Sequence, residues 1–148
     1  MPAWDPWVAL RARPHVELRL DPVAALLGGG MLVRIGERAV ITLDPALDGR
    51  SRRVALAHEL IHDERGGGCD EPGTPAGWDA VVARDEAAVD REVARRLVPA
   101  AGLRRWLEER FSVDDAVALW EVAEAFDVDE ATAARALSFV DAHPTPAG

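Results

Sequence analysis

The chain contains no lysine, asparagine, glutamine or tyrosine, so all 17 of its basic residues are arginine. Any group that stabilises an anion must therefore be Arg, His, Trp, Ser, Thr or a backbone N–H. Tyrosine, a common oxyanion donor, is excluded. The single cysteine, Cys69, excludes an internal disulfide and is typical of a protein from a reducing compartment.

The sequence also lacks any apolar run of 18 or more residues, which excludes a membrane-spanning helix. Residues 1–7 show no basic region followed by an apolar core, so we expect no signal peptide. The net charge of −9 argues against non-specific binding to nucleic acid, because phosphate repels an acidic surface. Together these absences predict a soluble, cytoplasmic protein.

What the chain does have is a length of 148 residues with 49% apolar residues, enough for one compact core. We expect a single domain over residues 1–141. Residues 142–148 contain two prolines and are expected to form a flexible tail.

Residues 58–62 read His-Glu-Leu-Ile-His, the H-E-x-x-H pattern of zinc peptidases. Positions i and i+4 share one helix face, with Cβ atoms ~5–6 Å apart. His58 and His62 can therefore each direct one nitrogen at the same Zn²⁺. Glu59 lies on the flank of that face, where its carboxylate can reach a water molecule at the metal without binding the metal. The pattern predicts two metal ligands and a general base, Glu59.

A catalytic zinc site needs a third protein ligand. The predicted helix at 79–98 offers Asp85, Glu86 and Asp90. Glu86 lies three positions before Val89, on the apolar stripe that should face inward, so it is the predicted ligand. Asp90 is one turn further along the same side and is expected to accept the N–H of a ligand imidazole, fixing its tautomer. Asp85 is rotated by about 100° towards the edge of the helix.

Hydrophobic patterning predicts an α+β fold: a small, mostly antiparallel three-stranded sheet, a buried motif helix and a helical C-terminal half. The motif helix should be buried because residues 54–61 leave almost no polar face around the histidines. The expected elements are a short helix at 5–13, a strand at 15–20, a brief helix from 21 to 28, a hairpin of strands at 31–35 and 39–43, and helices at 51–64, 79–98 and 101–110.

The remaining segments are a Gly- and Pro-rich loop at 66–77 and a region at 112–141 that resembles a helix-turn-helix unit. Ser112 and Asp115 resemble a capping box that would start its first helix. A turn at 127–129 and a last helix through Val140 follow. This region carries eight acidic residues and one arginine, so we expect it to contact the core or a protein partner and not DNA.

Residues 53–62, Arg-Val-Ala-Leu-Ala-His-Glu-Leu-Ile-His, resemble the motif helix of the ImmA/IrrE metallopeptidases. Residues 86–99, Glu-Ala-Ala-Val-Asp-Arg-Glu-Val-Ala-Arg-Arg-Leu-Val-Pro, are similar to that family's second motif. There a glutamate precedes an Ala-Asn/Asp pair, then Phe-Ala, then Leu-Leu-Met-Pro. The resemblance spans about residues 39–140 and places Glu86 at the metal-binding glutamate.

The second motif departs from the family at three positions, where a small residue, an aromatic residue and a leucine are usual. These positions hold Val89, Glu92 and Arg96, which change the packing of the helix and leave every metal residue in place.

The resemblance implies a zincin-like fold, a bound zinc ion and, as in several members, proteolysis of a helix-turn-helix repressor. We therefore expect a zinc metallo-endopeptidase that acts on a partner protein, with His58, His62 and Glu86 as ligands and Glu59 as base. The alternative is a non-proteolytic regulatory interaction module in which zinc is only structural.

Three further residues could take part in such a site. Cys69 is expected to be an ordinary thiol, although a thiolate could bind zinc or act as a redox-sensitive gate. His15, at the start of a strand, and His143, in the tail, are not expected to be ligands.

Overall fold

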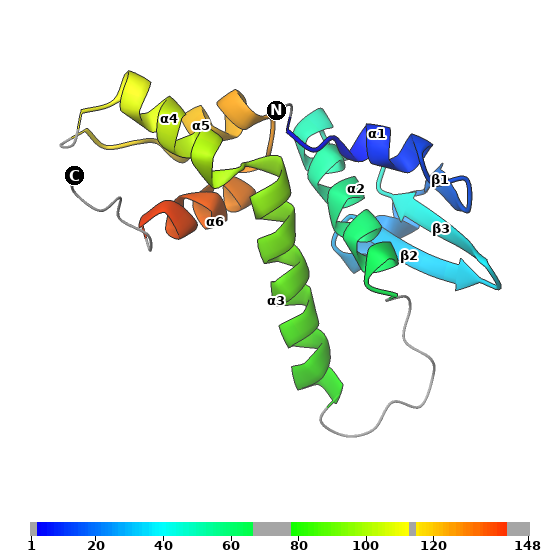
Figure 1. Ribbon diagram of the computed structural model, residues 1–148. Coiled ribbons are helices and arrows are strands. Elements are labelled where there is room, and N and C mark those ends of the chain that lie inside the picture. The colour runs from blue at the N-terminus through cyan, green and yellow to red at the C-terminus, as the bar shows by residue number, and fades with distance from the viewer. Residues whose placement is uncertain (1–2, 67–77, 113–114, 142–148) are drawn as a thin grey trace.

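The chain forms a small sheet followed by a set of helices, described over residues 3–66, 78–112 and 115–141 by a computed structural model (Figure 1). The α+β class and the helical C-terminal half are confirmed. Cys69, His143, the tail and all but the first residue of the predicted loop at 66–77 lie outside the described residues. In chain order the elements are α1 (Pro6–Arg11), β1 (Val16–Leu20), the 3-10 helix η1 (Pro22–Leu27), β2 (Gly30–Ile35), β3 (Arg38–Leu43), α2 (Gly49–Glu64), α3 (Trp78–Leu97), α4 (Ala100–Arg110), α5 (Leu119–Phe126) and α6 (Glu130–Asp141).

The sheet has the strand order β1-β3-β2, with β1 parallel and β2 antiparallel to β3. The expectation of a mostly antiparallel sheet is therefore wrong, because one of the two strand pairs is parallel. The reason is the connection: the chain reverses once through η1 and again at the β2–β3 hairpin, and two reversals restore the direction of β1. Gly36, with a φ of 62°, permits the hairpin turn.

Helix α2 lies between the sheet and α3 (Figure 1). Leu56 and Leu60 pack on the sheet side against buried residues such as Ile41. Ala57 and Ile61, one position further along, belong to the helical core. The motif helix is thus apolar on two faces, and Leu56, Ala57, Leu60 and Ile61 are all at most 1% exposed.

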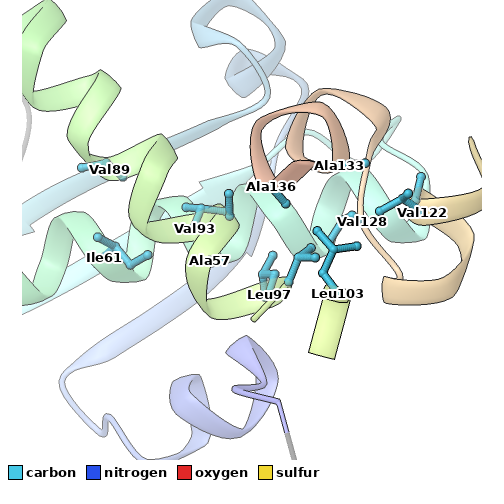
Figure 2. Close-up of a cluster of buried hydrophobic side chains, with 13 residues drawn as sticks. Ala57, Ile61, Val89, Val93, Leu97, Leu103, Val122, Val128, Ala133 and Ala136 are labelled. Atoms are coloured by element: carbon cyan, nitrogen blue, oxygen red, sulfur yellow. The ribbon is translucent and has the colours of Figure 1, made fainter. Parts of the chain in front are cut away.

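The C-terminal helices gather on the side of α3 away from the sheet (Figure 1). Figure 2 shows their buried side chains meeting those of α2 and α3 in one cluster. None of the helices in the described ranges is long and apolar enough to cross a membrane. The cluster includes Ala57, Ile61, Val89, Val93, Leu97, Leu103, Val122, Val128, Ala133 and Ala136.

The first helix of the acidic C-terminal region starts later than expected. The Ser112 N–H donates to Asp115 Oδ2 at 2.7 Å, so the predicted hydrogen bond forms, but residues 115–118 are not helical. Helix α5 begins at Leu119, where the Glu121 carboxylate accepts the Ala118 N–H at 3.1 Å. The acidic residue that caps this helix is therefore Glu121, six positions after Asp115.

Candidate metal centre

Two imidazoles project from one face of α2. The helix is started by Asp48, whose side chain accepts the Ser51 N–H at 2.8 Å. The four-residue spacing places the rings of His58 and His62 with centroids 4.7 Å apart, and their Nε2 atoms are 3.1 Å apart. Both side chains are mostly buried, at 20% and 13% exposure. Two nitrogen atoms are thus held close together at the protein surface.

Glu86 on α3 supplies the third donor. Its Oε2 lies 2.9 Å from His58 Nε2, and its Oε1 lies 2.8 Å from His62 Nε2. Val89, one turn later, is fully buried and fixes which side of α3 faces α2. The structure therefore brings together the three predicted ligands, with donor atoms that all lie within 4.8 Å of one another, and this group could hold a metal ion.

The spacing of these donors suits a single small cation. Nitrogen or oxygen atoms that lie ~2.0–2.1 Å from one zinc at tetrahedral angles are ~3.3 Å apart. The separations of 2.8–3.1 Å are close to that value. Two imidazoles and one carboxylate are also a donor set that zinc and other divalent transition metals accept. The residues therefore fit the implied zinc.

Asp90 lies behind the first imidazole, as the helix pattern predicts. Its Oδ1 is 3.1 Å from His58 Nδ1, so it accepts a hydrogen bond from the tautomer that carries its proton on Nδ1. That tautomer leaves the Nε2 lone pair pointing towards Glu86 and His62. On its other side Asp90 meets Arg135 of α6, whose Nη2 lies 3.6 Å from Oδ2. The arginine was not predicted here, since it lies 45 positions along the sequence from Asp90.

Asp85 lies on the Nδ1 side of the His62 imidazole and is not one of the three grouped donors. Its Oδ2 lies 3.9 Å from His62 Nδ1, and its Oδ1 accepts a hydrogen bond from Arg65 Nη2 at 2.7 Å. The edge position inferred from the sequence agrees with this placement. Each histidine thus has an acidic side chain near its Nδ1 atom, a symmetry that the sequence reasoning missed.

Glu59 is 7% exposed, and no hydrogen-bond partner is found for its carboxyl group within the described ranges. Burial raises the pKa of Glu59 to about 7; the charge of Glu86 also raises it, while that of His58 lowers it. The backbone of Gly30 makes room for it, because a Cβ added there would lie 3.1 Å from Glu59 Oε1. The role of Gly30 was also missed; the run of glycines at 28–30 was its only signal.

Two of the three donor residues, His58 and Glu86, line a cleft of about 420 Å³. His58, Glu59, Glu86 and Asp90 line it, so a molecule in the cleft can touch the Glu59 carboxyl group together with His58 and Glu86. His15 is not part of this site: its Nε2 lies 3.0 Å from Asp63 Oδ2.

Comparison with protein-family models, with curated proteins and with solved structures finds no match to this chain. The geometry of the site and the resemblance of its two sequence motifs are therefore what indicate a function.

Proposed function

We propose that the protein is a zinc-dependent metallo-endopeptidase with a zincin-like fold, similar to the ImmA/IrrE proteins. The observation that carries the proposal is the position of Glu59: a buried carboxyl group without a hydrogen-bond partner in the described part of the chain, beside a three-donor group in an open cleft. A purely structural metal has no need of such a group at the cleft.

His58, His62 and Glu86 would hold the zinc ion. When bound, zinc supplies a Lewis acid that polarises a peptide carbonyl and makes water more acidic. Asp90 keeps the Nδ1 proton of His58 in place, which leaves Nε2 as a donor to the cation.

Glu59 moves the protons of the reaction. Its carboxylate accepts a proton from the attacking water and later delivers it to the nitrogen of the leaving amine. Burial raises the pKa of Glu59 to about 7 in the metal-free protein, and the charge of a bound cation would lower it, which favours the carboxylate form that accepts the first proton.

The proposed substrate is a partner protein such as a helix-turn-helix transcriptional repressor. This part of the proposal comes from the family resemblance alone. The acidic C-terminal region favours a protein partner over DNA, since only Arg135 is basic between residues 112 and 141.

The test replaces Glu59 with glutamine and measures both zinc content and cleavage of an unstructured protein such as casein. We expect Glu59→Gln to keep stoichiometric zinc and to lose cleavage by about 100-fold or more. Glu37→Gln, an exposed glutamate at the hairpin, is the control and should cleave as the wild type does. Full cleavage by zinc-loaded Glu59→Gln would remove Glu59 as the base. A zinc-loaded wild type that cleaves nothing would favour the structural-zinc alternative.

A further inference from the structure

The cleft beside the metal centre has an uneven distribution of charge. Four of its lining side chains are acidic: Glu59, Glu86, Asp90 and Asp129. His58 is the single potentially cationic side chain that the described part of the chain contributes to the lining. A ligand that enters this cleft therefore meets carboxylates.

Three of these carboxylates are already engaged. Glu86 belongs to the metal group, and Glu59 is the proposed base. Asp90 lies between His58 and Arg135, at 3.1 and 3.6 Å. None of these three carboxylates is therefore available to pair with a cationic group of a ligand.

Asp129 is the acidic residue of the cleft that lacks a cationic partner among the described residues. Its Oδ1 accepts the Thr132 N–H at 2.8 Å and so caps α6. Arg50 and Arg53 of α2 instead lie 3.7 and 4.0 Å from Asp127. One carboxylate charge at the cleft is thus left for a ligand.

The cleft also presents exposed apolar surface. Leu27, at the end of η1, lines the cleft and is 58% exposed, and Leu47 and Val54 line it too. A large exposed leucine beside a cleft offers an apolar side chain of a ligand a place to leave water. Leu26, its neighbour, is 84% exposed and does not line the cleft.

Glu59 provides an independent sign that the cleft takes a ligand. The residue is 7% exposed, lines the cleft and has no hydrogen-bond partner for its carboxyl group in the described ranges. A buried carboxyl group without a partner is costly to keep. A polar molecule bound in the cleft would supply the hydrogen-bond partner that Glu59 lacks.

We propose that the cleft selects peptide segments that carry an arginine or lysine side chain, which pairs with Asp129, together with a large apolar side chain, which packs against Leu27. The proposal rests on the proposed function, because it names the substrate class of the same site. Repulsion from Asp129 disfavours segments that are acidic throughout.

The experiment uses the zinc-loaded Glu59→Gln protein, which should bind peptides without cleaving them. A positional-scanning library of end-blocked decapeptides is bound to it and the retained peptides are identified by mass spectrometry. We expect Arg or Lys at one position to be retained about fivefold better than Gln, and Glu to be retained worst. A library that shows no basic preference overturns the proposal.

Added substitutions then locate the preference. Asp129→Asn and Asp129→Ser remove the charge but can still cap α6, and both should abolish the basic preference. Asp127→Asn is the control, because Asp127 lies two positions away and does not line the cleft. Leu27→Ser should weaken the apolar preference and Leu26→Ser should not. A basic preference that survives both Asp129 variants contradicts the proposal.

The wild-type protein separates this inference from the proposed hydrolysis. Charge-selective binding to Glu59→Gln without any cleavage by the wild type would leave the ligand class standing and remove the peptidase. Cleavage by the wild type without a basic preference would leave the peptidase standing and remove the proposed ligand class.

Discussion

Glu59 lies in surroundings that disfavour the ionised form of its carboxyl group. It is 7% exposed, beside Leu60 and close to the backbone of Gly30, and its pKa is raised to about 7 chiefly by burial. A side chain that is costly to ionise in the folded state is poised to exchange protons. The same burial makes Glu59 a source of instability when no metal is bound.

The pH dependence of stability tests that cost. Because the pKa of Glu59 is higher in the folded protein than in the unfolded chain, the folded state loses stability as pH rises from about 4.5 to about 7. Glutamine does not titrate. The unfolding free energy of Glu59→Gln, measured relative to that of the wild type, should therefore increase by about 2 kcal/mol as pH rises from 5 to 8. Urea denaturation of both chelator-treated proteins measures this, and a difference independent of pH would contradict it.

Asp90 contacts the candidate metal centre through the imidazole of His58. Asp90→Asn can still accept the Nδ1 proton but carries no charge, so His58 becomes a weaker donor. We expect zinc affinity to fall by about 10-fold or more in competition with a chromogenic chelator. Glu92→Gln, on the same helix, is the control and should bind zinc as the wild type does. Equal affinities in all three proteins would separate Asp90 from the metal centre.

At the scale of elements, α2 and α3 together make the site. Helix α2 carries two donors and Glu59, the proposed base, and α3 carries the third donor and Asp90. Ile61 and Val89, buried in the core that both helices share, fix how these helices face each other. Packing in the core and geometry at the surface are therefore coupled, since Ile61 directly precedes His62.

Truncating Ile61 should disturb both the packing of the core and the geometry of the donor residues. Ile61 is 1% exposed, so Ile61→Ala removes buried methylene and methyl groups and leaves a cavity between α2 and α3. We expect a loss of about 2–5 kcal/mol of unfolding free energy, and about 1 kcal/mol for Ile61→Val. Ile35→Ala, at a position that is 64% exposed, is the matched control and should change stability by less than about 0.5 kcal/mol. Chemical denaturation measures all three, and similar values for Ile61→Ala and Ile35→Ala would contradict the packing argument.

At the scale of the whole molecule, charged side chains connect segments that are distant in sequence. Glu64, at the end of α2, pairs with Arg96 of α3 at 2.7 Å and also with Arg13 after α1. The guanidinium groups hold the pKa of Glu64 below its usual range. These contacts join the N-terminal part to α2 and α3, so the helix that carries His58 and His62 is held from both sides.

A bound metal should add a further connection between α2 and α3. A cation held by His58, His62 and Glu86 binds only the folded chain, so it should stabilise the protein by about 2.7 kcal/mol at a free concentration 100-fold above Kd. Thermal denaturation with and without zinc measures this as a rise in Tm. Glu86→Ala should remove most of the rise, and Glu108→Ala, on α4, should keep it. An equal rise in Glu86→Ala would show that zinc binds elsewhere.

The sequence by itself determined the features that depend on local spacing. The four-residue interval of His58 and His62 and the apolar stripe through Val89 were enough to place the three donors, because helix geometry is the same in every fold. The α+β class and the position of nearly every element follow from patterning in the same way.

Only the tertiary structure decided the contacts between residues that are far apart in the chain. It made β1 parallel to β3, placed Gly30 against Glu59 and brought Arg135 to Asp90. It also left Asp129 at the cleft without a cation among the described residues. Such contacts depend on how whole elements pack, and no local pattern of residues specifies that packing.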